Sequence, residues 1–249
     1  MKRIYLDPGD CLTDKHAVNI KGNTFRYLSK VLRMKEGDIF SGFDGAGFEH
    51  TVKILTAGGE HIKASLLESK KVSGAELPFN MLLFQSIPKK GKMDSIIRDV
   101  AQLGIKKIIP VLSERVICSL TSCREKGKMK RWEKIAAESS RIAGRQMVTE
   151  IGDFIRFEDA VKIKTDASVI FWEQATASLR EIVKNLPEVK SGSSVKIFVG
   201  PEGGYTENEV SLAKACGAMP ASMGRRILRV ETASVIAAAL IIYELENRM

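Results

Sequence analysis

From residue 79 onward, short apolar runs alternate with segments whose apolar residues recur at helical spacing. The runs have strand length, and the segments stop at glycine or proline, as helices do. We expect strands at residues 79–87, 105–112, 167–172, 195–200 and 221–223, and helices at residues 93–104, 132–144, 179–186 and 206–217 and from 231 onward. This alternation predicts the α/β fold class, with a mostly parallel sheet covered by helices. Ligands of such sheets bind beyond the carboxyl ends of the strands.

The first 73 residues have a different pattern, rich in predicted strands. Residues 38–43 and 48–55 flank an Asp-Gly turn at Asp44-Gly45, which is typical of a β-hairpin. A polar break with Ser and Gly follows at residues 70–76. We therefore expect two domains, at residues 1–73 and 74–249.

One helix is expected in this first part, from Thr24 to Met34. Its apolar residues share one face, and Arg26, Lys30 and Arg33 share another at spacing i, i+4, i+7. The basic face fits contact with an RNA backbone, and it fits an ordinary solvated helix side equally well.

The net charge of +9 over 249 residues favours a polyanionic partner such as nucleic acid. A modest positive charge is also common among soluble proteins. The apolar run at residues 235–243 is too short to cross a membrane, and the N-terminus lacks the pattern of a signal peptide. We expect a cytoplasmic protein with no membrane partner.

The cysteines do not form a metal-binding pattern. Cys11, Cys118, Cys123 and Cys216 include no Cys-x-x-Cys pair, and the histidines lie far from most of them. Reduced thiols and no bound metal are the simple expectation.

Two glycine-containing loops follow predicted strands near the C-terminus. They are Phe198–Tyr205, with the sequence FVGPEGGY, and Met223–Ala233, with the sequence MGRRILRVETA. The first has neither the Lys-Ser/Thr of a P-loop nor the spacing of a dinucleotide fingerprint. It fits a tight turn or a ligand site, because glycine lets a ligand approach bare peptide groups.

Three arginines crowd the second loop directly before Glu231 and Thr232. A guanidinium is a planar fork of donors that suits phosphate or an anionic base edge. The alternatives are a surface cluster paired with Glu231, and a structural role for Glu231 and Thr232 as residues that start a helix.

Together the two loops resemble the SPOUT superfamily of RNA methyltransferases, and most closely its RsmE-type family, which methylates uridine N3 in small-subunit (16S) ribosomal RNA. Further segments match that family: Lys89, Lys92-Met93-Asp94, Leu103–Ile105, Ser113–Arg115, Arg131-Trp132, Ala137-Glu138 and Gly144-Arg145. The resemblance covers nearly the whole chain. It implies a C-terminal trefoil-knot domain that binds S-adenosylmethionine and a small N-terminal PUA-like β-barrel that binds RNA.

The resemblance also implies site residues. For the cofactor these are Val199, Gly200, Glu202, Gly203, Gly204, Met223, Gly224, Ile227 and Leu228. Arg229 is expected to hold uracil or its phosphate, and Glu231, in preference to Glu202, is expected to accept the N3 proton. The expected RNA contacts are Arg26, Lys30, Arg33, Arg145 and Arg225.

Several points stay open at this level. The partner is either small-subunit rRNA or an assembled small ribosomal subunit. SPOUT proteins usually form homodimers, and the apolar final helix fits a dimer interface or a buried helix equally. The alternatives are another SPOUT methyltransferase, acting on tRNA or on a ribose 2′-oxygen, and a non-catalytic ribosome-assembly factor that binds RNA.

Overall fold

The computed structural model describes residues 2–14, 17–72, 75–89, 91–116 and 127–249, and Cys118 and Cys123 lie outside this part of the chain. The chain forms two compact units. The first consists of residues 1–76 and 140–148, and the second consists of residues 77–139 and 149–249. The domain boundary at residue 73 stays a prediction, and no pattern in the sequence points to the role of segment 140–148 in the first unit.

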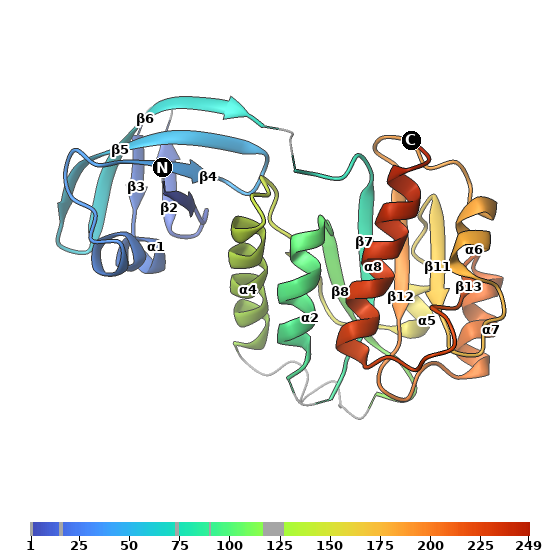
Figure 1. Ribbon diagram of the computed structural model, residues 1–249. Coiled ribbons are helices and arrows are strands. Elements are labelled where there is room, and N and C mark those ends of the chain that lie inside the picture. The colour runs from blue at the N-terminus through green and yellow to red at the C-terminus, as the bar shows by residue number, and fades with distance from the viewer. Residues whose placement is uncertain (1, 15–16, 73–74, 90, 117–126) are drawn as a thin grey trace. The chain divides into compact units, whose positions relative to one another are not determined.

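The first unit is built on a six-stranded sheet in the order β1-β4-β5-β6-β3-β2 (Figure 1). Its strands are β1 (Arg3–Tyr5), β2 (Cys11–Asp14), β3 (Ala17–Ile20), β4 (Ile39–Phe43), β5 (Phe48–Gly58) and β6 (His61–Lys71). The pair β1 and β4 is parallel, and the remaining pairs are antiparallel. The predicted hairpin is confirmed, because Asp44 Oδ1 accepts the N–H of Ala46 at 2.8 Å between β4 and β5.

The helical segment of this unit differs from its prediction. An α-helix, α1 (Gly22–Arg26), continues into a π-helical turn, η1 (Tyr27–Val31). The single α-helix expected over residues 24–34 is therefore wrong in its winding and its ends. The Ser29 hydroxyl donates to Phe25 O at 2.8 Å, and Arg33, at φ 53°, lies outside the helix. Hydroxyls that bond the preceding turn compete with regular α-helical bonding.

The second unit contains a seven-stranded sheet in which every pairing is parallel. The strands are β7 (Asn80–Ser86), β8 (Lys107–Leu112), β9 (Glu150–Ile151), β10 (Ile155–Arg156), β11 (Ala167–Phe171), β12 (Ser194–Val199) and β13 (Met219–Ala221). Their order is β10-β8-β7-β12-β11-β13, and β9 also pairs with β8. The predicted parallel sheet is confirmed.

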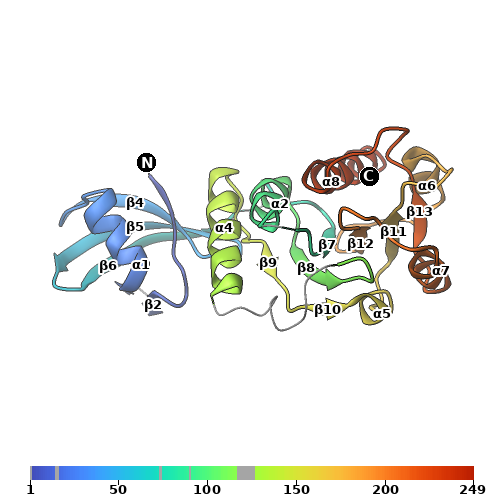
Figure 2. The same ribbon diagram turned by 90° about the horizontal axis from the view of Figure 1, so that it is seen from below.

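Helices cover both faces of this sheet (Figure 2). They are α2 (Met93–Val100), the 3₁₀ turn η2 (Ala101–Leu103), α4 (Lys128–Ile142), α5 (Phe157–Ala160), α6 (Leu179–Asn185), α7 (Glu207–Ala215) and α8 (Val230–Glu246). One core joins a sheet face to α2, α4, α6 and α8, and another joins the opposite face to α5 and α7. Along β12, Ile197 and Phe198 therefore belong to different cores, as the alternation of side chains in a strand requires.

The strand order places the predicted loops together. The chain runs from β7 to β8 in one direction along the sheet, and β12, β11 and β13 extend in the other. The segments that follow β11, β12 and β13 meet at the carboxyl ends of these strands, which lie together because the strands are parallel. No helix of the described residues is long and apolar enough to cross a membrane.

Candidate functional site

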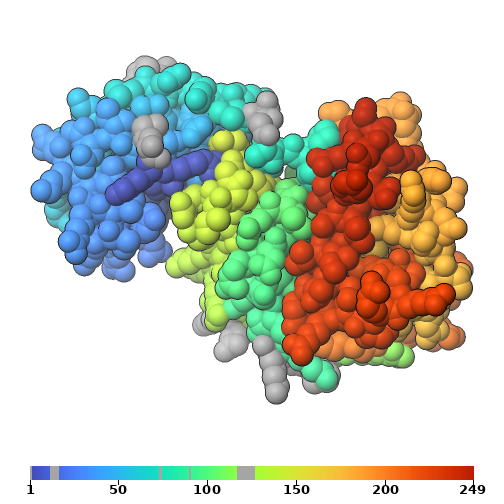
Figure 3. Space-filling view, in the orientation of Figure 1, coloured from blue at the N-terminus to red at the C-terminus, as the bar shows by residue number. Residues whose placement is uncertain are grey.

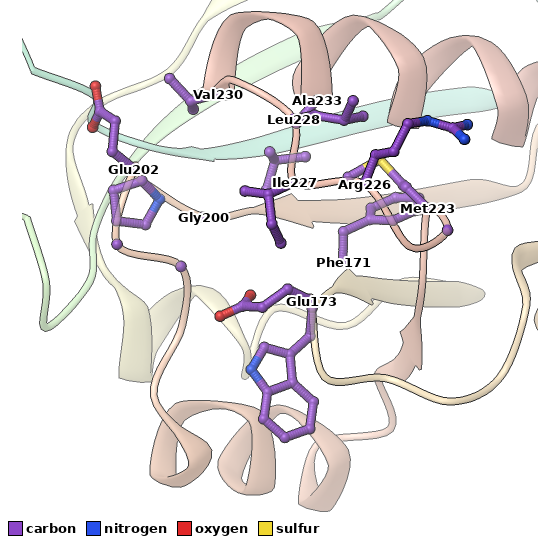
Figure 4. A pocket seen from close by; sticks show the side chains of 16 residues that line it. Phe171, Glu173, Gly200, Glu202, Met223, Arg226, Ile227, Leu228, Val230 and Ala233 are labelled. Carbon is purple, nitrogen blue, oxygen red and sulfur yellow. The ribbon is translucent and has the colours of Figure 1, made fainter.

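A cavity of about 200 Å³ lies at the carboxyl ends of β11, β12 and β13 (Figure 4). Its walls come from the segments after these strands and from the first turn of α8. The lining residues are Phe171, Trp172, Glu173, Val199, Gly200, Pro201, Glu202, Gly203, Gly204, Met223, Gly224, Arg226, Ile227, Leu228, Val230 and Ala233. The two glycine-containing loops, which are separate in sequence, thus form one concave site.

All nine residues predicted to bind the cofactor line this cavity. Their role in binding stays a prediction, but the structure brings them together. Sequence reasoning missed several others: Phe171, Trp172, Glu173, Pro201, Arg226, Val230 and Ala233. The signal for Phe171–Glu173 was available, because they end a predicted strand at the same edge of the sheet as the glycine loops.

The first loop needs glycine for close packing. A Cβ on Gly200 would lie 3.2 Å from the carbonyl carbon of Gly204. Gly204 has φ +67°, and a Cβ there would lie 2.7 Å from Glu173 Oε1. Figure 4 shows the Glu173 carboxylate directed toward this loop. The segment is therefore both a tight turn and a wall of the cavity.

The second loop is more open. Gly224 has φ +100°, nothing lies within 4 Å of a Cβ built on it, and its N–H donates to Ser222 Oγ at 3.1 Å. Ile227 is 83% exposed although it lines the cavity. Figure 4 shows its side chain between the two loops. An exposed apolar side chain at this place can pack on an apolar ligand surface.

A lysine connects the carboxylates beside the cavity. Lys92 Nζ lies 2.9 Å from Glu202 Oε1 and 3.5 Å from Glu231 Oε2. The hydrogen bond that Lys92 donates to Glu202 raises the pKa of Lys92. Burial raises the pKa of Glu202, but the bonds from Lys92 and from backbone N–H groups outweigh it and hold this pKa below its usual value. Glu202 is therefore a poor proton acceptor.

Two buried polar atoms at the site lack a hydrogen-bond partner among the described residues. They are Trp172 Nε1 and Glu231 Oε2, of which the second lies 3.5 Å from Lys92 Nζ. Buried polar groups normally find a partner, so each of these atoms marks a place where a ligand can bond.

A series of hydrogen-bonded, buried polar side chains connects the site to the sheet. Ser234 Oγ lies 2.6 Å from Gln85 Oε1, and Ser86 Oγ donates to Tyr205 Oη at 3.1 Å. Burial raises the pKa of Tyr205 far above its usual value. These hydrogen bonds join α8 and the end of the glycine loop to β7, and they therefore fix the cavity walls to the sheet.

The predicted catalytic residues lie around the cavity. Arg229 is the N-cap of α8; its side chain is exposed, and its carbonyl accepts the N–H of Ala233 at 2.8 Å. Glu231 lies in the first turn of α8 and pairs with Lys92. Arg225 is exposed in the same loop. Neither Arg225 nor Arg229 is among the described residues that line the cavity.

The predicted RNA contacts divide into two groups. Arg26, Lys30 and Arg33 are exposed on the first unit, and their contact with RNA stays a prediction. Arg145 is only 2% exposed, and its Nε and Nη2 both donate to Glu76 Oε2, at 3.2 and 2.9 Å. This burial argues against the predicted contact of Arg145 with RNA and gives the residue a structural role.

Comparisons with known proteins identify the family. An RNA methyltransferase domain matches residues 75–242, and an RNA methyltransferase PUA domain matches residues 20–67. Ribosomal RNA small subunit methyltransferase E of Bacillus subtilis is 30% identical, with 92% of this chain and 90% of that protein aligned. Its counterpart from Synechocystis is 33% identical, with 89% and 71% aligned. The chain belongs to the ribosomal RNA small subunit methyltransferase E family.

Solved structures agree with membership of this family. The methyltransferase E of Neisseria gonorrhoeae, crystallised with S-adenosylmethionine, matches with TM-score 0.82 and 28% identity over 97% of this chain and 96% of that one. A putative methyltransferase of Legionella pneumophila, also with bound S-adenosylmethionine, matches with TM-score 0.84 and 25% identity over 96% of each chain. The predicted SPOUT fold with a PUA-like first domain is confirmed.

Proposed function

We propose that this chain transfers a methyl group from S-adenosylmethionine to N3 of a uridine in small-subunit ribosomal RNA. Family membership supports the reaction class, and the relatives crystallised with S-adenosylmethionine support the cofactor. The observation that carries the proposal is the single cavity in which both glycine-containing loops meet. The choice of uridine N3 rests on the resemblance of these loops to the family.

The cavity residues fit this cofactor. Gly200 and Gly224 leave peptide groups accessible to an adenosyl group, and Trp172 Nε1 is a buried donor that lacks a partner among the described residues. Ile227 and other apolar side chains offer surface for a base. Bound S-adenosylmethionine supplies an electrophilic methyl group on a positively charged sulfonium. The carboxylate of Glu173 in the cavity wall favours a ligand with positive charge.

Residues beside the cavity remove the N3 proton and stabilise the charge that remains on uracil. Removal of the N3 proton needs an acceptor, and Glu231 Oε2 is a carboxylate oxygen without a hydrogen-bond partner in the described chain. Glu202 is less suitable because Lys92 and backbone N–H groups occupy its oxygens. Arg229, exposed next to Glu231, stabilises the negative charge left on uracil or binds its phosphate.

The substrate base must be accessible. Uridine N3 is hidden in paired RNA, so the target is unpaired or turned out of its stack when it reaches the cavity. The exposed basic residues of α1 and η1 hold the RNA backbone, either in free small-subunit rRNA or in the assembled subunit. The proposal includes a cytoplasmic homodimer. The dimer is supported by α8, which Figure 3 shows on the surface of the second unit, and which exposes Leu240 and Tyr243.

Two measurements test the function. Mass spectrometry of small-subunit rRNA from cells lacking this chain is expected to show loss of one N3-methyluridine, restored by the gene. Loss of a 2′-O-methyl group or of a tRNA modification instead would favour another SPOUT activity. Calorimetry with S-adenosylmethionine is expected to show binding; no binding together with intact rRNA modification would favour the assembly factor.

A further inference from the structure

We infer that Lys92 is a positioning residue for methyl transfer, because its ammonium joins the carboxylate of the glycine loop to the carboxylate at the start of α8. The inference rests on the proposed function only for its effect on methylation. The bridge itself, Glu202–Lys92–Glu231, is defined by contacts within the second unit.

The bridge connects three elements. Lys92 is the N-cap of α2, Glu202 belongs to the loop after β12, and Glu231 lies in the first turn of α8. The segment before α2 adds a second connection, since the backbone N–H of Lys89 donates to both oxygens of Glu202 at 3.1 and 3.2 Å. The start of α2 therefore holds the glycine loop through one side chain and one peptide group.

The central residue of the bridge, Lys92, does not line the cavity. Glu202 lines the cavity, and so does Val230, the neighbour of Glu231, whereas Lys92 does not. Figure 4 shows the Glu202 carboxylate pointing away from Ile227 and hence out of the cavity. Lys92 thus holds the glycine loop and the first turn of α8 in place from outside the cavity, and its effect on the reaction is indirect.

The charges explain why an ammonium is needed here. Glu202 from the glycine loop and Glu231 from α8 are the charged side chains that act on Lys92. Both carboxylates lie within 3.5 Å of its nitrogen. Without the ammonium, the two neighbouring carboxylates repel each other, and Glu202 loses the hydrogen bond from Lys92 that lowers its pKa.

Lys92→Met and Lys92→Arg test this role. We expect Lys92→Met to lower kcat/KM about tenfold or more, as loss of a charge-paired positioning contact does. The pH below which its activity falls is expected to be higher, because Glu202 loses the Lys92 hydrogen bond that lowers its pKa. Lys92→Arg should restore both values in large part. Adding Glu202→Gln to Lys92→Met removes one repelling charge and is expected to return this pH toward its original value.

A measurement without cofactor separates the bridge from the proposed function. Amide hydrogen exchange at residues 200–204 is expected to be faster in Lys92→Met than in the unmodified protein. Lys89→Met is the matched control: it removes an exposed positive charge nearby but keeps the N–H that binds Glu202, so exchange should stay unchanged. Circular dichroism and the melting temperature check that each variant folds; if Lys92→Met does not fold, Glu202→Gln takes its place in the exchange measurement.

The outcomes are distinguishable. Unchanged exchange, kcat/KM and pH profile in folded Lys92→Met would overturn the positioning role and leave the proposed function intact. An unmodified protein that neither binds S-adenosylmethionine nor methylates rRNA would overturn the proposed function, while exchange at residues 200–204 would still decide the bridge.

Discussion

Arg229 shows how one residue can serve the substrate without serving the cofactor cavity. Arg229 is exposed, while its carbonyl starts α8 by accepting the N–H of Ala233. We expect Arg229→Ala to lower methylation by roughly a hundredfold or more, as loss of a charge-stabilising group does. Cofactor affinity should change little, since the backbone bond remains. Single-turnover kinetics and calorimetry test this; an equal loss of affinity and rate would contradict the assigned role.

Site residues were predictable from the sequence where they lie close together along the chain. The glycines at positions 200 and 204 and the arginines at 225–229 were evident as a candidate site. The bridge through Lys92 was not, because it joins residues more than a hundred positions apart that meet only in the folded sheet. The pair of the buried Arg145 and Glu76 also escaped prediction, because these residues, 69 positions apart, meet only in the folded chain.

At the scale of elements, the start of α7 anchors the end of the glycine loop. Thr206 Oγ1 accepts the N–H of Glu209 at 3.2 Å, and the N–H of Thr206 donates to Glu209 Oε2 at 2.9 Å, and these two bonds form a capping box. We expect Thr206→Ala to lower the free energy of unfolding by about 1 kcal/mol. Denaturant titration measures this change.

A matched control exists for this capping prediction. Thr232 is an exposed threonine in the first turn of α8, a helix whose N-cap makes no side-chain hydrogen bond. Thr232→Ala is expected to leave the free energy of unfolding nearly unchanged. If both variants lose the same stability, the capping bonds of Thr206 do not explain its effect.

The long elements of the second unit were predictable because hydrophobic spacing and stop signals agree there. The helix expected to stop at Gly104 does so, with this glycine at φ 94°. The strands β9 and β10 have two residues each, too few for any periodicity to appear. β13 lies two residues earlier than expected, at Met219–Ala221, because its place is set by pairing with β11. Pairing of this kind is not encoded locally.

At the scale of the whole molecule, the basic residues of the first unit provide a test of RNA binding. We expect replacement of Arg26, Lys30 and Arg33 by glutamine to weaken binding to a small-subunit rRNA fragment. The slope of log affinity against log salt should fall by about 2 to 3, the value for three lost phosphate contacts. Fluorescence anisotropy at several salt concentrations measures both effects. Replacing Lys162, Lys164 and Lys184, exposed on the second unit, is the control of equal charge, and equal effects in both variants would reject a specific contact.

The segment 140–148 belongs to the first unit although most of the second unit surrounds it in sequence. Glu76 bonds the N–H groups of Gln146 and Met147 at 2.9 and 2.8 Å, besides its pair with Arg145. A fragment cut after residue 76 would therefore lack part of its own fold. On a translating ribosome the same dependence sets an order of events: the leading unit cannot be finished until the polypeptide has grown past position 148, so the two halves mature as one product.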